Sequence, residues 1–193
     1  PYDTVECPEH LALSERAARE SVVLLKNNGI LPLKKETIRT IGVIGPNADS
    51  RASLIGNYHG TASEYITVLD GIRRYAGDTA RILYSEGSHL FLNKTEGLAW
   101  DFDRLSEART VARNSDVVIL CLGLDETLEG EEGDTGNSYA SGDKTDLQLP
   151  ESQRKLMEAV AMEDTPVILC LMAGSDIDLP FAADHFDAIV DLW

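Results

Sequence analysis

Short apolar runs rich in β-branched residues recur along the chain and alternate with segments of helical spacing. Five of these runs are too short for helices and lack polar alternation, which is typical of strands buried on both faces of a parallel sheet. They span Ile38–Ile44, Ala80–Tyr84, Asp116–Leu122, Pro166–Met172 and Ala188–Leu192. The pattern therefore predicts a mostly parallel sheet.

Apolar positions at helical spacing predict helices before and between these strands. The predicted helices span His10–Asn27, Thr67–Tyr75, Phe102–Arg113, Glu151–Met162 and Asp178–Phe186. In the first of them, an apolar stripe from Leu11 to Leu25 ends before Asn28-Gly29, which supplies a stop signal. The alternation of strands and helices predicts an α/β fold, a mostly parallel sheet sandwiched between helices.

The charge balance narrows the classes of partner. The chain has 193 residues, with 17 Lys and Arg against 33 Asp and Glu, and a net charge of −16. Nucleic acids and anionic membranes both attract basic proteins, so neither is an expected partner. No stretch approaches the ~20 apolar residues of a membrane span. Cys7, Cys121 and Cys170 are too few for a disulfide scaffold, and free thiols favour a cytoplasmic location.

The longest predicted loop, residues 123–149, holds six carboxylates between Asp125 and Asp134. It follows a predicted strand, and functional loops in α/β sheets lie beyond the carboxyl ends of strands. Like-charge repulsion in such a cluster favours the protonated form of some carboxyl groups, as a general acid requires. A solvated surface loop is the alternative, and a calcium site is a third, although the spacing misses that of a calcium loop. The acidic, glycine-rich composition also predicts a flexible loop that buries little apolar surface.

Two glycine-containing segments each allow two interpretations. Gly42-Val-Ile-Gly45 resembles part of a dinucleotide-binding fingerprint, but its third glycine is absent, which favours a plain turn after the strand. Gly56-Asn57-Tyr58-His59-Gly60 offers amide, phenol and imidazole groups that suit the hydroxyls and ring face of a sugar. The alternative is a tight loop with Tyr58 packed beneath it. The other histidines show no ligand spacing, and no metal is expected.

The order of these segments resembles that of a known family. The matching segments are Glu9–His10, Leu11–Ala12, Ala17–Asn27, Gly29–Leu33, Ile41–Ala48, Gly56–Gly60, Gly123–Asp134, Leu147–Gln153 and Leu171–Gly174. Together they resemble the second domain of glycoside hydrolase family 3, from about Pro8 to Trp193. Within that family the chain looks most similar to the β-xylosidase and β-glucosidase branch.

The resemblance implies a two-domain active site. In the family, a (β/α)8 barrel carries a nucleophilic Asp, and an α/β/α sandwich supplies the general acid/base from a long loop. Setting Asp134 on the Asp of the family motif places Glu131 on the catalytic glutamate, with Glu132 and Glu129 as alternates. Asn57 and Tyr58 match a loop near the sugar pocket. No cofactor is implied.

The resemblance also suggests how the chain is organised. We expect residues 1–36 to form an inter-domain linker and the first helix, and residues 37–193 to form the sandwich domain. Because the chain opens at Pro1 in a loop and stops at Trp193 in a strand, we expect a piece of a longer protein, truncated at the C-terminal end of the sandwich and lacking the barrel.

The expected function is that of a segment of an exo-acting retaining β-glycosidase, a β-glucosidase or β-xylosidase that hydrolyses terminal non-reducing β-linked sugars. The segment would supply the general acid/base and would be inactive alone. Expected partners are a β-linked oligosaccharide or aryl glycoside and the enzyme's own barrel, with homo-oligomer formation left open. The alternative is a non-catalytic, flavodoxin-like module that binds carbohydrate or another protein.

Overall fold

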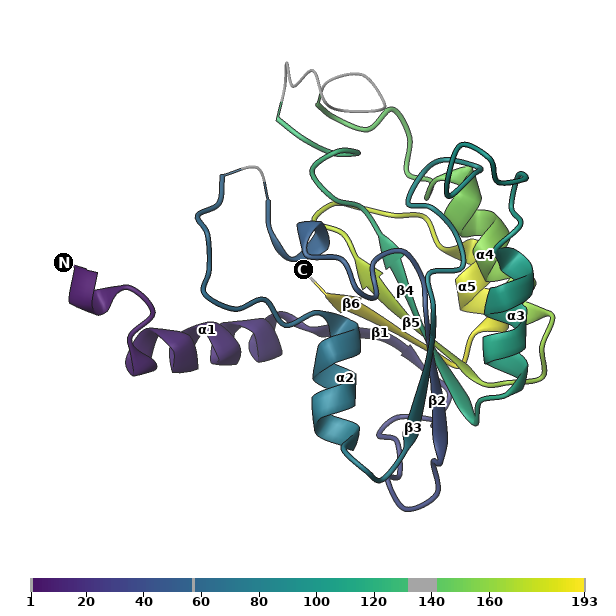
Figure 1. Ribbon diagram of the computed structural model, residues 1–193, viewed down its shortest axis with the longest axis horizontal. Helices are drawn as coiled ribbons and strands as arrows, with labels where there is room; N and C mark the ends of the chain where they lie inside the picture. Colours follow the sequence, from purple (N-terminus) through teal and green to yellow (C-terminus); the bar gives the residue numbers. More distant parts are fainter. Residues whose placement is uncertain (1, 57, 132–141, 193) are drawn as a thin grey trace.

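A six-stranded sheet lies at the centre of the molecule, with helices on both of its faces (Figure 1). The computed structural model describes residues 2–56, 58–131 and 142–192. The strands are β1 (Val23–Asn27), β2 (Thr40–Ile44), β3 (Arg81–Ser85), β4 (Val117–Gly123), β5 (Val167–Met172) and β6 (Ala188–Leu192). The helices are α1 (Pro8–Ser21), α2 (Val68–Ala76), α3 (Leu105–Arg113), α4 (Glu151–Ala161) and α5 (Pro180–His185), with short 3-10 turns η1 (Tyr2–Thr4) and η2 (Ala52–Leu54).

The strand order is β1-β6-β5-β4-β2-β3. The neighbours from β6 through β3 are all parallel, and only β1, at the edge, runs antiparallel to β6. Every residue of β4 is buried, as expected for a central strand covered on both faces. The predicted α/β fold with a mostly parallel sheet is confirmed.

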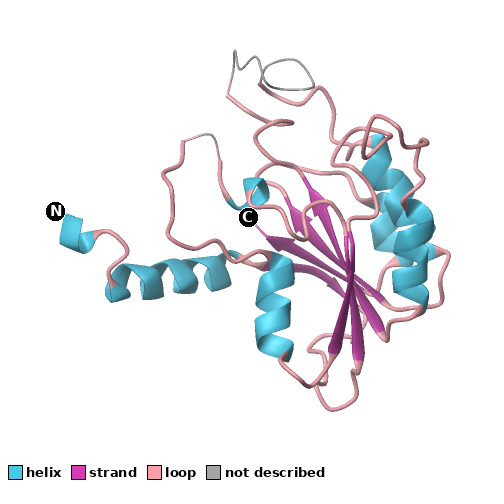
Figure 2. Ribbon diagram, in the orientation of Figure 1, coloured by secondary structure: helices cyan, strands magenta, loops and turns pink. Residues whose placement is uncertain are grey.

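Two layers of helices cover the sheet (Figures 1 and 2). Helices α3, α4 and α5 lie on one face and enclose the main core, in which Leu120, Leu156 and Phe186 are almost fully buried. Helix α2 lies on the other face, where Leu69 packs in a smaller cluster with Val43 and other residues. Helix α1 projects from the sheet and buries no residue. None of the described helices is both long enough and apolar enough to cross a membrane.

All five predicted strands are present, with bounds that differ by at most two residues. The predicted helices after residue 60 are present as well; three are shorter than predicted, and α2 has the predicted length but lies one residue further along the chain. α2 begins one residue later than predicted because the Thr67 hydroxyl accepts the Asp70 backbone N–H at 3.2 Å, which makes Thr67 the N-cap and Val68 the first helical residue. Capping side chains of this kind are easily included in a predicted helix.

The predicted helix His10–Asn27 is wrong in its second half. Helix α1 ends at Ser21, Val22 is extended, and Val23–Asn27 form β1, which pairs with β6. β-Branched and leucine residues fit a helix or a strand, and the partner strand decides between them. The apolar stripe therefore belongs to two elements, and the sheet includes a strand from the segment assigned to the linker and first helix.

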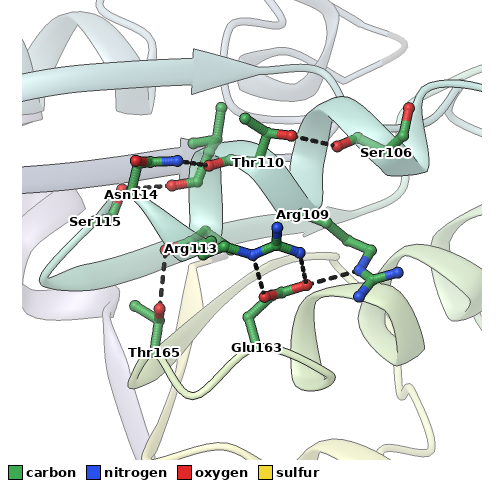
Figure 3. Close-up of polar contacts among 10 residues, drawn as sticks. Ser106, Arg109, Thr110, Arg113, Asn114, Ser115, Glu163 and Thr165 are labelled. Carbon is green, nitrogen blue, oxygen red and sulfur yellow. Dashed lines mark hydrogen bonds and ion pairs between the residues drawn. The ribbon is translucent and has the colours of Figure 1, made fainter.

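A polar cluster fastens α3 to the segment after α4 (Figure 3). The Glu163 carboxylate accepts hydrogen bonds from Arg109 Nε at 2.7 Å and from Arg113 Nε at 2.9 Å and Nη2 at 3.1 Å. These bonds, Arg113 first, lower the pKa of Glu163 from 4.5 to about 2. Close by, the Thr165 hydroxyl donates to the Ala112 carbonyl at 2.8 Å. The cluster joins two helices of the same layer.

Candidate active site

A cleft of about 800 Å³ opens at the carboxyl edge of the sheet. Its walls come from the loops after β4 and β5, the end of β6, residues 53–56 and 58, and the ends of α1 and α2 that face it. Parallel strands bring their carboxyl ends to one edge, so loops far apart in the sequence meet there. Ligand sites in α/β proteins are concave and commonly lie at this edge.

Four carboxylates of the loop after β4 line the cleft, those of Asp125, Glu126, Glu129 and Glu131. Asp125 folds this part of the loop into a turn, because its carboxylate accepts the Thr127 N–H at 2.9 Å and the Thr127 hydroxyl at 2.6 Å. The backbone N–H of Glu129 donates to the Asp125 carbonyl at 3.1 Å. The turn gathers acidic side chains at one side of the cleft.

Contacts from two other segments reach these carboxylates. The Ser175 hydroxyl, beyond β5, donates to Glu129 Oε2 at 2.5 Å. His59 Nε2 lies 3.8 Å from Glu126 Oε2, and this pair is an ion pair only when the imidazole is protonated. The loop after β4 is thus linked to the loop after β5 and to the glycine-flanked segment after η2.

The predicted site residues fall into two groups. Glu131, Glu129 and Tyr58 all line the cleft, and Glu131 is exposed. Tyr58 is 85% exposed, so the alternative in which it packs beneath a tight loop is wrong. Asn57 and Glu132 lie outside the described residues. The structure therefore brings together three of the five, from two segments about 70 residues apart.

The base of the acidic loop is tightly held. Gly123, the last residue of β4, has φ +154°, and a Cβ at this position would overlap the Met172 carbonyl of the adjacent strand. The side-chain amide of Gln153 bonds to both the N–H and the carbonyl of Gly123. The side-chain amide of Asn47 donates to the Leu124 carbonyl at 3.2 Å.

The loop is also more deeply packed than its composition predicts. Leu124, Leu128 and Leu149 are buried and belong to the main core. The expectation of a loop that buries little apolar surface is wrong for these residues, because one leucine at the start of the loop, one in the turn that follows and one at its end are buried in the core. The prediction was based on the acidic and glycine residues of the loop and did not take these leucines into account.

Two glycines, one within β2 and one directly after it, have a packing role. Gly45 has φ +124°, and a Cβ there would overlap the Cys121 carbonyl of β4. A Cβ on Gly42 would lie 2.7 Å from Ser115 Oγ. Both glycines allow β2 to lie close to its neighbours, which supports the interpretation as a plain turn rather than a nucleotide-binding loop.

Several lining residues were missed by sequence reasoning. Ser175 directly follows the matched segment Leu171–Gly174, yet its bond to Glu129 spans 46 residues and depends on β4 and β5 being neighbours. Ala18, Ser21 and Val22, at the end of α1, also line the cleft. They line the cleft because the helix ends at Ser21 and the chain then turns into β1. The predicted helix His10–Asn27 continued through this point, so the sequence did not indicate the turn.

No group of three or more His, Cys, Asp or Glu side chains within residues 2–56, 58–131 and 142–192 is placed to hold a metal ion. The lining of the cleft combines carboxylate side chains with apolar ones. Its carboxylates can exchange protons, and together with a serine hydroxyl and an aromatic ring they can bind a ligand rich in hydroxyl groups. The fold and the cleft define an α/β domain with clustered carboxylates on a loop at the carboxyl edge.

Comparison with known proteins identifies the family. Residues 22–193 match the C-terminal domain of glycosyl hydrolase family 3, and the chain belongs to this family. A probable β-D-xylosidase 7 of Arabidopsis thaliana is 36% identical over 180 residues, covering 92% of this chain and 21% of that protein. A periplasmic β-glucosidase of Salmonella typhimurium is 35% identical over 210 residues, covering 100% of this chain and 26% of that protein.

Solved structures of the family share the fold. A β-glucosidase from Erythrobacter marinus superposes with a TM-score of 0.83 at 28% identity, over 97% of this chain and 27% of that one. A family 3 exo-β-xylosidase in complex with a xylobiose aziridine probe gives a TM-score of 0.80 at 27% identity, over 98% of this chain and 24% of that one. The chain thus spans about a quarter of the length of the relatives it matches.

Proposed function

We propose that this chain is the acid/base-bearing segment of an exo-acting retaining β-glycosidase that removes terminal β-linked glucose or xylose. The observation that carries the proposal is the position of Glu131, which lies on the loop after β4, lines the cleft and is exposed. The named relatives, β-xylosidases and β-glucosidases, support the substrate class.

The mechanism needs a second carboxylate from outside the chain. A retaining glycosidase places two carboxyl groups about 5–5.5 Å apart, one to attack the anomeric carbon and one to protonate the leaving oxygen. We assign the attack to an Asp of a barrel domain that packs against the carboxyl edge of the sheet. Glu131 then donates its proton to the leaving group and, in the second step, takes a proton from water.

The contacts of the cleft support distinct roles for its carboxylates. Glu129 is held by the Ser175 hydroxyl, and Glu126 faces His59. Glu131 lies further along the loop at an exposed position, where a sugar held between two domains could reach it. Tyr58, also exposed at the cleft, offers a ring for stacking against a sugar.

The test is the substitution Glu131→Ala in the intact enzyme. We expect the rate on a natural disaccharide to fall by about 10²–10⁴-fold. The glycosylation step should be affected far less with an activated aryl glycoside, because its leaving group departs without a proton. Azide should restore turnover in the second step, since it attacks without a base.

Glu132→Ala and Glu129→Ala are the matched controls, each one or two positions from Glu131. If either shows the leaving-group dependence and azide rescue while Glu131→Ala behaves like the wild type, the assignment moves to that residue. If none of the three does, the acid/base proposal is wrong.

A further inference from the structure

Two buried side-chain amides hold the start of the loop that carries Glu129 and Glu131. Asn47 follows β2, and Gln153 lies in the first turn of α4; both have 0% of their surface exposed. They bond to consecutive residues at the end of β4, Gly123 and Leu124. Gln153 belongs to the segment Leu147–Gln153 that the family resemblance includes, yet the catalytic scheme gives it no role.

The bonds at Gly123 and Leu124 use every backbone polar group of the two residues. The Gly123 N–H donates to Gln153 Oε1 at 2.9 Å, and Gln153 Nε2 donates to the Gly123 carbonyl at 2.7 Å. The Leu124 N–H donates to the Met172 carbonyl at 2.9 Å, and Asn47 supplies the donor for the Leu124 carbonyl. Buried backbone groups need such partners, so the chain can leave β4 in only one well-paired direction.

Gln153 makes a third bond that extends this arrangement. Its Nε2 also donates to the Leu90 carbonyl at 2.8 Å, in the connection between β3 and α3. Both N–H donors of the amide are therefore used. The acidic loop leaves the sheet at Gly123 and ends at Leu149, just before α4. Because Gln153 lies in the first turn of α4, its bonds to Gly123 join the start of the loop to its end.

We propose that Gln153 is a positioning residue for the acid/base of this enzyme. By fastening both ends of the loop, it holds the cleft carboxylates where proton transfer to the leaving group requires them. This inference rests on the proposed function. An error of about 1 Å in the position of a catalytic group can cost roughly 10²-fold in rate, so a residue that acts only through the loop is expected to affect catalysis.

The first variant is Gln153→Met in the intact enzyme. Methionine keeps the length and approximate volume of the side chain and removes all three hydrogen bonds. We expect kcat/KM, which reports the glycosylation step, to fall about 10–100-fold for a natural disaccharide and much less for an activated aryl glycoside. In the glycosylation step, a displaced acid slows only the substrate whose leaving group needs its proton, whereas the second step is slowed equally for both substrates.

The matched control is Thr165→Val, which removes one partly buried hydrogen bond to the Ala112 carbonyl, just before the start of β5 and at the opposite end of that strand from the cleft. We expect Thr165→Val to lower the midpoint of thermal unfolding with no change in leaving-group dependence. This separates lost stability from lost positioning.

A second variant, Gln153→Glu, keeps the test decisive if Gln153→Met does not fold. The new carboxyl can still accept the Gly123 N–H, but when ionised it sets a negative oxygen against the Gly123 and Leu90 carbonyls. Protonation restores one donor. The ratio of variant to wild-type turnover on the disaccharide should therefore rise as the pH is lowered, within the range where circular dichroism shows both proteins folded.

The outcomes distinguish the two proposals. A selective loss on the disaccharide, recovering at low pH in Gln153→Glu, supports positioning by Gln153. Equal losses on both substrates, no loss, or a ratio that does not change with pH would overturn it while Glu131→Ala still shows its effect. If Glu131→Ala and its two controls leave the disaccharide rate unchanged, the proposed function itself is wrong, and the role of Gln153 falls with it.

Discussion

Substituting Glu163 with Gln tests the ion cluster that joins α3 to the segment after α4. The Glu163 side chain is 8% exposed and accepts three hydrogen bonds from Arg109 and Arg113 of α3. Glutamine keeps the size of the side chain and removes its charge. We expect the free energy of unfolding to fall at neutral pH and to change little in acid.

The magnitude follows from the pKa of Glu163. The two arginines lower this pKa from 4.5 to about 2, which corresponds to at most about 3.4 kcal/mol at about 1.36 kcal/mol per tenfold change in proton affinity. The side chains of Arg109 and Arg113 are 39% and 63% exposed, so water and salt screen the pairs. We therefore expect Glu163→Gln to lower the free energy of unfolding at pH 7 by about 1–2 kcal/mol.

The pH dependence has a definite sign. The pKa is lower in the folded state than in the unfolded chain, so the carboxylate stabilises the fold fully above pH 4.5. This stabilisation is lost as the pH falls from 4.5 to about 2, because protonation then becomes favourable even in the folded state. The stability difference between wild type and Glu163→Gln should shrink over this range.

Urea unfolding at pH 7, and at a series of lower pH values, measures this difference. At pH 7 we also expect the midpoint of thermal unfolding to fall by about 2–8 °C for a chain of this size. Glu158→Gln is the control, because Glu158 pairs with Lys155 on the same helix at 51% exposure and should contribute less than about 0.5 kcal/mol. A difference for Glu163→Gln that stays constant with pH, or that does not exceed the control, would refute the reasoning.

Two further predictions concern the segment and its sheet. The isolated chain should not hydrolyse an aryl β-glucoside or aryl β-xyloside, because the proposed nucleophile lies outside it; turnover comparable to that of a whole glycosidase would contradict the two-domain mechanism. Gly123→Ala should lower the free energy of unfolding by more than about 2 kcal/mol, since a Cβ would overlap the Met172 carbonyl. Gly97→Ala, where a Cβ meets open space, should cost less than about 0.5 kcal/mol in the same urea titration, and equal effects would count against this explanation.

The sheet was the most predictable part of the molecule. Strands such as Val117–Gly123 are buried along their whole length, and burial on both faces leaves an uninterrupted apolar run in the sequence. The segment Val23–Asn27 was not predictable in this way, because its leucines are about 55% exposed and its strand exists through pairing with β6. Edge strands leave a weaker pattern than central ones.

The candidate site was predictable in its chemistry and less so in its architecture. The acidic loop and Tyr58 could be singled out from residue types and family resemblance, and both line the cleft. The bond between Ser175 and Glu129, and the wall formed by the end of α1, depend on which strands are neighbours. Residues that act through such contacts have no signature in their own spacing.

The choice of amides at the base of the loop has a physical reason. A single residue presents one backbone donor and one backbone acceptor, and only a side chain that carries both kinds of group, such as that of Gln153, can satisfy the two groups of Gly123 at once. An arginine or an ionised carboxylate there would place a charge in a fully buried position, which is costly without a partner of opposite sign. Asn47 and Gln153 are neutral, so they fix the loop without adding to the charge of the cleft.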